Sequence, residues 1–326
     1  MQPINKNSYI SKHIQYFFNK RFLSKGLGVI SAVLLLLATL IYFYAPLFII
    51  EIKNPVIETA RTCLTSEHIE QKTDNKNLIN FYWQGTGEVE LNADLYFAMR
   101  QPAKATLILL HGIRSHKETW QNIVRYLQQQ GFNAVTVDLR AHGNSKGEYC
   151  TFGYYEKQDI SALIDVLQKR FHIHTPIGIW GHSLGGAIAV QCLAVDKRIQ
   201  FGIVESAYAD FAQITQKYSK DYLSFEATSF NEFLLERAGE IARFNPTEVN
   251  PQDYAFFITQ PVLLLHGTED KKINPANSQK IFEALRSSHK EIIQIENANH
   301  YDIWQKGGKK LHKKIVDFIE KSLIVS

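Results

Sequence analysis

The chain has 326 residues, of which 45% are hydrophobic and 21% are charged, and its formal net charge is +4. This length and apolar content are sufficient for one sizeable folded core, and they exclude a globally disordered chain. Residues 1–25 carry five Lys or Arg residues and no Asp or Glu, so the remainder has a net charge of +4 − 5 = −1. A near-neutral remainder argues against nucleic-acid binding, and we expect no nucleic-acid partner.

Residues 26–50 form an uncharged apolar stretch. A helix rises about 1.5 Å per residue, so this stretch exceeds the roughly 30 Å hydrocarbon core of a bilayer. Tyr42 and Tyr44 are typical of the aromatic belt at a membrane surface, and Pro46 is expected to kink or end the helix. We predict an uncleaved transmembrane anchor rather than a signal peptide, whose apolar region spans only about 7–15 residues.

Flanking charges predict the orientation of this helix. Basic residues precede it, whereas the charges that follow are mixed. By the positive-inside rule, residues 1–25 are predicted to form a cytoplasmic tail, and the rest of the chain to lie on the periplasmic, lumenal or extracellular side. We interpret the polar residues 51–80 as a stalk.

Residues 81–326 are predicted to form one α/β domain. Apolar runs such as ATLILLHG and PVLLLHG are typical of strands buried on both faces, and they alternate with amphipathic helical patterns. Repeated βα units predict a mainly parallel sheet with helices on both faces. The alternation stops between about 208 and 258, which we interpret as a helical cap inserted over the carboxyl ends of the strands.

The pentapeptide Gly181-His182-Ser183-Leu184-Gly185 matches the pattern G-x-S-x-G. It follows the apolar run PIGIW and opens an apolar helix, which is the context of a nucleophile elbow. Small flanking residues permit a sharp turn that projects the serine hydroxyl at the N-terminus of the helix. Backbone N–H groups at that terminus stabilise a developing negative charge. Ser183 is therefore the predicted nucleophile.

A serine hydroxyl is a weak nucleophile unless a base accepts its proton. In proteins with a nucleophile elbow, the catalytic residues occur along the chain in the order Ser, acid, His. His300 follows the predicted strand EIIQIENAN, and Asp270 follows PVLLLHG. We expect both at the same edge of the sheet as Ser183, with His300 as the base and Asp270 as the carboxylate that orients it. Glu269 is an alternative acid, although a solvated loop position suits it better.

Two backbone N–H groups are predicted to form the oxyanion hole. One belongs to Leu184, and the other to Ile113 in the His-Gly-Ile turn after ATLILL. The chemistry requires no metal and no organic cofactor. His172 and His174 form an HxH pair, but no Cys or carboxylate lies nearby, so an exposed loop is favoured over a zinc site.

The ordered motifs resemble the α/β-hydrolase superfamily: LLHG at 109–112, DLRAHGNS at 138–145, GHSLGG at 181–186, LLLHGTED at 263–270 and NH at 299–300. They are most similar to its serine aminopeptidase and monoacylglycerol-lipase-like branch, over about residues 85–322. The resemblance implies Ser183, Asp270 and His300 as a triad, with oxyanion stabilisation near Ile113. That branch includes lipases, esterases, thioesterases and peptidases, so the resemblance does not define the substrate. The His-Gly-Ile turn also departs from the HGGG of many lipases.

We therefore predict a membrane-anchored serine hydrolase that cleaves carboxylic esters through an acyl-enzyme on Ser183. Its expected partners are a small-molecule or lipid ester and the membrane, through residues 26–50. One alternative is a serine aminopeptidase, in which a cap glutamate would hold the substrate amine; the candidates are Glu226, Glu232 and Glu236. The other alternative is a non-catalytic, membrane-tethered binding protein of the same fold.

Two features of the sequence leave alternatives open. Apolar cap residues are consistent either with an acyl-binding site or with packing of the cap alone; they are Leu223, Phe225, Phe230, Phe233 and Leu234. Cys192 is expected in the core, whereas pairing of Cys63 with Cys150 depends on an oxidising compartment and on a proximity that sequence does not define.

Overall fold

The computed structural model describes residues 29–52, 77–223 and 228–325. It divides into two units, Met1–Phe48 and Ile49–Ser326. The predicted cytoplasmic tail, most of the predicted stalk and Cys63 lie outside the described residues.

Residues 29–44 form a helix whose apolar side chains are exposed, and a turn at Ala45 and Pro46 separates it from α2 (Leu47–Ile50). The turn agrees with the expected effect of Pro46, because proline disrupts the helical hydrogen-bond ladder. By length and composition, the stretch Val29–Ile50 is suitable for crossing a membrane. It is compatible with a membrane anchor and equally with a signal sequence.

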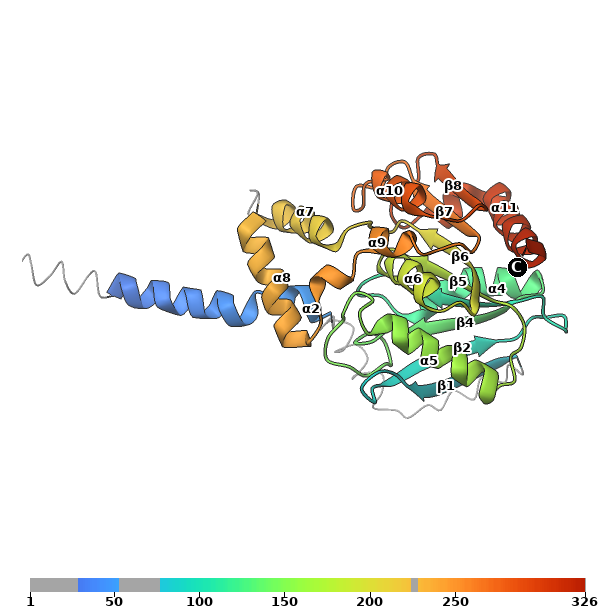
Figure 1. Ribbon diagram of the computed structural model, residues 1–326, viewed down its shortest axis with the longest axis horizontal. Helices are drawn as coiled ribbons and strands as arrows, with labels where there is room; N and C mark the ends of the chain where they lie inside the picture. The colour runs from blue at the N-terminus through green and yellow to red at the C-terminus, as the bar shows by residue number, and fades with distance from the viewer. Residues whose placement is uncertain (1–28, 53–76, 224–227, 326) are drawn as a thin grey trace, which may run out of the picture. The chain divides into compact units, whose positions relative to one another are not determined.

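The second unit contains an eight-stranded sheet in the order β1-β2-β4-β3-β5-β6-β7-β8 (Figure 1). Strands β3 to β8 pair in parallel, whereas β2 is antiparallel to both β1 and β4. The predicted mainly parallel sheet is thus confirmed. The strands are β1 (Leu78–Gln84), β2 (Glu90–Tyr96), β3 (Thr106–Leu110), β4 (Asn133–Asp138), β5 (Ile177–His182), β6 (Ile199–Glu205), β7 (Val262–Gly267) and β8 (Lys290–Ile295).

Strand β1 corrects the predicted boundary of the stalk. It begins at Leu78, inside the stretch 51–80 that was interpreted as stalk. Its sequence LINFYWQ buries Phe81 and Trp83 while the residues between and after them are exposed, as expected of an edge strand. Strand β2 pairs with β1 in an antiparallel hairpin.

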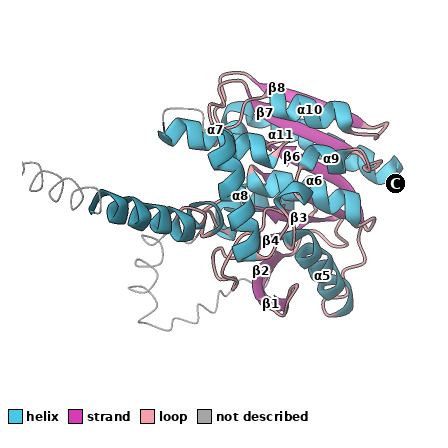
Figure 2. Ribbon diagram, turned by 60° about the vertical axis from the view of Figure 1, so that its left-hand side comes forward, coloured by secondary structure: helices cyan, strands magenta, loops and turns pink. Residues whose placement is uncertain are grey.

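Helices cover both faces of the sheet, as predicted (Figure 2). One face carries α5, α6, α9 and α10, and the other carries α4 and α11. Side chains of α4 and α11 join those of the central strands in one buried cluster that includes Leu127, Trp180 and Ile319. The helices of the body are α4 (Gln121–Gln129), α5 (Glu156–Lys169), α6 (Leu184–Val195), α10 (Ala276–Ala284) and α11 (Ile303–Val325), with a short 3-10 turn η1 (Lys117–Trp120) before α4.

The chain between β6 and β7 is a helical insertion, which confirms the predicted cap. It comprises α7 (Phe211–Leu223), α8 (Thr228–Ala242), η2 (Pro246–Glu248) and α9 (Pro251–Ala255). Two asparagine side chains tie its first residues in place: Asn250 Oδ1 accepts the N–H of Phe211, and Asn277 Oδ1 accepts the N–H of Ala209, both at 3.0 Å. The entry into the cap is therefore fixed at the carboxyl end of β6.

Candidate active site

Ser183 lies in the sharp turn between β5 and α6. Its φ of 56° and ψ of −117° fall in a region that costs a non-glycine residue about 1–3 kcal/mol. The Ser183 N–H donates to the Glu205 carbonyl of neighbouring β6 at 2.8 Å, so this conformation is held by the sheet. The predicted elbow therefore occurs at the predicted residue, and the hydroxyl is positioned at the start of α6.

Two glycines permit this close packing. A Cβ at Gly181 would lie 2.0 Å from the carbonyl oxygen of Gly185, and a Cβ at Gly185 would lie 2.1 Å from that of Leu110. These contacts involve backbone atoms, which have little freedom to move. Helix α6 therefore packs directly against the end of β3.

Replacing Gly185 with alanine is expected to lower the free energy of unfolding by about 3 kcal/mol, because the added methyl group overpacks the backbone at Leu110 and His111. Chemical denaturation would measure this change. Gly112→Ala is the matched control, because its Cβ would lie 3.3 Å and 3.4 Å from side-chain atoms of His182 and Ser183 and 3.7 Å from the nearest backbone atom. We expect it to cost about 1 kcal/mol or less. Equal losses in the two variants would contradict this account of the packing.

The three predicted residues meet in one chain of hydrogen bonds. His300 Nε2 lies 3.0 Å from Ser183 Oγ, and His300 Nδ1 lies 2.7 Å from Asp270 Oδ2. All three side chains belong to buried residues, and they come from the ends of β5, β7 and β8. The distances allow His300 to accept the hydroxyl proton while Asp270 orients its ring.

Asp270 is strongly held in its ionised form. Burial on its own raises the pKa of this carboxyl, but hydrogen bonds to His266 and His300 and from the Ile273 N–H lower it well below its ordinary range. Asp270 Oδ1 accepts the N–H groups of Lys272 and Ile273, both at 2.9 Å. The carboxylate therefore remains charged and fixed beside the imidazole.

His300 is held as a neutral base. Burial lowers its pKa below 6.5, and this effect exceeds the opposing effect of the hydrogen bond with Asp270. The neighbouring His182, whose ring centroid is 4.9 Å away, lowers the pKa further. At neutral pH the imidazole is therefore available to accept a proton.

The His-Gly-Ile turn lies against the elbow, as the oxyanion prediction requires. A Cβ at Gly112 would be 3.4 Å from Ser183 Cβ, so the two turns are in contact. Among the hydrogen bonds of the described residues, none uses the backbone N–H of Ile113 or Leu184. Both predicted donors are consequently available to a substrate oxygen.

Two buried histidines, His111 and His142, stabilise this turn through hydrogen bonds. His111 Nε2 accepts the Leu139 N–H at 3.1 Å, and His142 Nε2 accepts the Arg114 N–H at 3.2 Å. Burial lowers the pKa of His142 to about 4, so it stays neutral. The nearby Arg140 forms a buried ion pair with Asp159 at 2.8 Å.

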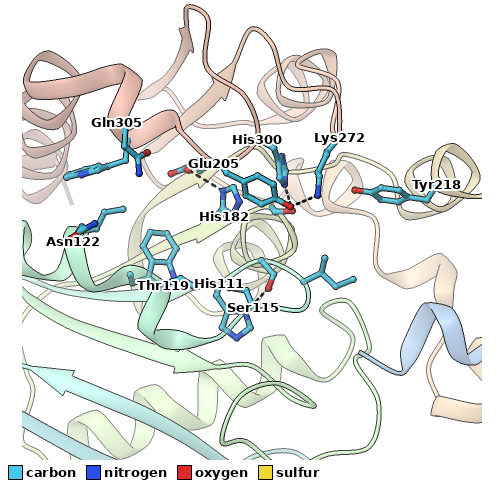
Figure 3. Close-up of a pocket in the computed structure, with 17 residues that line it drawn as sticks. His111, Ser115, Thr119, Asn122, His182, Glu205, Tyr218, Lys272, His300 and Gln305 are labelled. Atoms are coloured by element: carbon cyan, nitrogen blue, oxygen red, sulfur yellow. Dashed lines mark hydrogen bonds and ion pairs between the residues drawn. The ribbon is translucent and has the colours of Figure 1, made fainter. Parts of the chain in front are cut away.

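The nucleophile opens into a pocket with a volume of about 230 Å³ (Figure 3). Sequence reasoning had not assigned several of its lining residues, which come from β6, α7, the loop after β7 and the start of α11: Glu205, Tyr218, Lys272, Tyr301 and Trp304. Lys272 and Tyr301 follow Asp270 and His300 within two residues, so proximity to the motifs was an available signal. Glu205 and Tyr218 carried no such signal.

The described cap residues that were considered for acyl binding or amine binding do not line this pocket. Phe230, Phe233 and Leu234 do not line the pocket, and neither do Glu232 and Glu236. Leu234 is buried, which favours packing of the cap over an acyl site. The side chains of Leu223, Phe225 and Glu226 lie outside the described residues.

The remaining acids and cysteines have structural positions. Glu269 is exposed, and Asp302 accepts the N–H of Asn299 at 2.6 Å. Cys150 and Cys192 are free and buried. Over the described ranges, no cluster of three or more His, Cys, Asp or Glu side chains is arranged to hold a metal ion.

Comparison with known proteins identifies relatives across the predicted domain. A family model described as serine aminopeptidase, S33, matches residues 101–236. The uncharacterized protein YqkD of Bacillus subtilis is 26% identical over 221 residues, which are 66% of this chain and 71% of that protein. The uncharacterized protein YfhR of Escherichia coli is 27% identical over 227 residues, 68% and 72% of the two chains. Human protein ABHD12B is 22% identical over 207 residues, 62% and 55% of the two chains.

Solved structures show the same fold. An esterase of Pyrococcus furiosus superposes with a TM-score of 0.62 at 21% identity, covering 75% of this chain and 90% of the esterase. Est1E of Butyrivibrio proteoclasticus, solved with bound ferulic acid, superposes with a TM-score of 0.60 at 18% identity, covering 75% and 99% of the two chains. Because the sheet order and these superpositions agree, the chain has the α/β-hydrolase fold.

Proposed function

We propose that this protein is a serine hydrolase that cleaves carboxylic esters through an acyl-enzyme on Ser183. The observation that carries the proposal is the continuous hydrogen-bonded chain from Ser183 Oγ through His300 to Asp270, with distances of 3.0 Å and 2.7 Å. A serine, a neutral imidazole and an ionised carboxylate in this geometry are the components of nucleophilic acyl transfer.

The proposed reaction has two stages. His300 Nε2 accepts the Ser183 hydroxyl proton as Oγ bonds to the ester carbonyl carbon, and the resulting oxyanion accepts hydrogen bonds from the N–H groups of Ile113 and Leu184. His300 then donates that proton to the departing alkoxide, which leaves as the alcohol. His300 then accepts a proton from water as the water oxygen bonds to the acyl carbon. His300 returns this proton to Oγ as the bond between the acyl carbon and Oγ breaks, which releases the carboxylic acid and regenerates Ser183. Asp270 stabilises the imidazolium that forms in both stages.

An ester is favoured over a peptide as the substrate. An aminopeptidase needs an acidic group to hold the substrate amine. The cap candidates Glu232 and Glu236 do not line the pocket, and the acidic residue that does, Glu205, shares the pocket with the cationic Lys272. Two proteins with the same fold are named esterases: the Pyrococcus furiosus esterase and acetyl xylan esterase 1 of Thermoanaerobacterium. We further propose that the apolar stretch Val29–Ile50 anchors the chain, with the N-terminus in the cytoplasm and the hydrolase domain on the outer side.

The test is turnover combined with covalent labelling of the full-length chain in detergent. We expect release of p-nitrophenol from p-nitrophenyl acetate and butyrate, and stoichiometric attachment of a fluorophosphonate to the peptide that contains Ser183. Excess ester present during labelling should protect the serine. Turnover without modification of Ser183 would refute the assigned nucleophile, and the absence of both would support a binding protein of the same fold. Turnover of aminoacyl amides in preference to the esters would identify a peptidase.

A further inference from the structure

A buried carboxylate lies one strand away from the nucleophile. Glu205 ends β6 and pairs in register with His182 of β5, the residue that precedes Ser183. Glu205 therefore faces the pocket on the same side of the sheet as His182, and Figure 3 shows the two side chains together. The Glu205 side chain is only 10% exposed. The mechanism proposed above does not use this carboxylate.

The hydrogen-bonding capacity of Glu205 is largely unused by the protein. Its Oε2 accepts a long hydrogen bond from Trp180 Nε1 at 3.3 Å. Its Oε1 lies 3.2 Å from His182 Nδ1, but this nitrogen makes no hydrogen bond with adequate geometry to any described residue. A carboxylate accepts about four hydrogen bonds, and buried polar groups in folded proteins are rarely left without partners. Glu205 is therefore equipped to accept hydrogen bonds from a molecule in the pocket.

The surroundings of Glu205 suit an uncharged polar group. The pocket wall beside it combines aromatic rings with the side-chain amides of Asn122 and Gln305, which Figure 3 places on the side away from Tyr218. A hydrocarbon chain here would desolvate the carboxylate and leave it only its contacts with Trp180 and His182. A cation would pair with the carboxylate, but it offers no acceptor to the amide N–H groups, and Lys272 lines the same pocket. Hydroxyl groups serve as donors to the carboxylate and as acceptors from the amides.

The position of this wall relative to His300 indicates which part of an ester it contacts. The His182 ring lies 4.9 Å from the His300 ring, centroid to centroid. In acyl transfer, the histidine donates its proton to the oxygen of the departing alcohol. The alcohol part of the substrate must therefore lie beside His300, next to His182 and Glu205.

We propose that Glu205 determines specificity by accepting hydrogen bonds from a hydroxyl-bearing alcohol part of the substrate, such as a polyol or sugar ester. This inference rests on the proposed function. It predicts a substrate whose leaving group is hydrophilic, in contrast to a long-chain alcohol.

Three butyrate esters test the inference with the full-length chain: glyceryl monobutyrate, propyl butyrate, which has the same three-carbon alcohol without its two free hydroxyls, and butyrylcholine. Wild-type protein is expected to favour the glyceryl ester in kcat/KM. Glu205→Leu should reduce kcat/KM for that ester roughly 10- to 100-fold, the range for a lost hydrogen bond to a charged group, and change propyl butyrate by less than about threefold. Glu205→Gln, which keeps an acceptor for Trp180, should give an intermediate loss. Glu291→Gln, at an exposed position on β8, is the control.

The outcomes separate this inference from the proposed function. An equal loss on both esters in Glu205→Gln would overturn it, because Glu205 would then act only on the catalytic residues or on folding. An unchanged glyceryl preference, or a preference for butyrylcholine that depends on Glu205, would overturn it as well. Hydrolysis of none of the esters would instead refute the proposed function. In that case, calorimetry of ester binding tests the inference about Glu205. Tighter binding of glyceryl monobutyrate than of propyl butyrate, with the difference lost in Glu205→Leu, would support the subsite. Equal binding of the two esters to the wild type would overturn it.

Discussion

Replacement of Ser183 by alanine is expected to lower kcat for p-nitrophenyl butyrate by about 10⁶, which corresponds to removal of the whole acyl-enzyme route. The loss should be this large because no acyl-enzyme forms without the serine hydroxyl, which lies 3.0 Å from His300 Nε2 in the wild type. KM should change little, since the substrate would still bind in the pocket and its carbonyl oxygen would still accept hydrogen bonds from the two N–H groups of the oxyanion hole. Steady-state kinetics at substrate concentrations that bracket KM would measure both constants.

A matched control separates this effect from damage to the fold. Ser229 lies exposed in α8 of the cap, and Ser229→Ala should retain wild-type kcat. Alanine at position 183 keeps the strained φ of 56°, so the thermal midpoint should remain close to that of the wild type. A Ser183→Ala protein with more than about 1% of the wild-type kcat would contradict the assignment, since residual oxyanion stabilisation is far weaker than that.

Asp270→Asn is expected to lower kcat by about 10⁴, because the amide no longer holds the ring of His300 in the required tautomer or stabilises its imidazolium. The change also removes a charge that raises the pKa of His300. Only the neutral imidazole accepts a proton, so kcat/KM falls as the pH drops through this pKa. In the wild type, this decline of kcat/KM at low pH, the acid limb of the profile, is therefore expected below pH 6.5. In the variant, the acid limb should move to a still lower pH.

The pH dependence of kcat/KM between pH 4 and 9 would measure both effects. Glu269→Gln removes a negative charge from the adjacent, exposed position and should leave the rate and the acid limb nearly unchanged. A shift of the acid limb to higher pH in Asp270→Asn would show that the limb reflects protonation of a group other than His300. Full activity of Asp270→Asn would show that a different carboxylate orients His300, with Glu269 as the first candidate.

Much of this architecture was predictable because it follows from local patterns. Continuous apolar runs identified the central strands, since strands covered on both faces have no polar side. The glycines flanking Ser183 identified the elbow, and the structure explains them by backbone contacts near 2 Å. Asp270 and His300 were predicted from their places after strands, because the carboxyl ends of parallel strands meet at one edge. Strand β1 was missed, because the pattern of an exposed edge strand resembles that of a polar segment.

The pocket, by contrast, was decided by tertiary structure. Glu205 is an unremarkable acid in the sequence, and only the pairing of β6 with β5 brings it beside His182 and the nucleophile. Tyr218 of α7 also lines the pocket, whereas Phe230 and Phe233 of α8, for which an acyl site was one of two alternatives, do not. The sequence was therefore sufficient for the fold and the three residues of the hydrogen-bonded chain, whose motifs are local. The substrate-facing wall required the structure, because contacts between distant segments leave no periodic or local pattern in the chain.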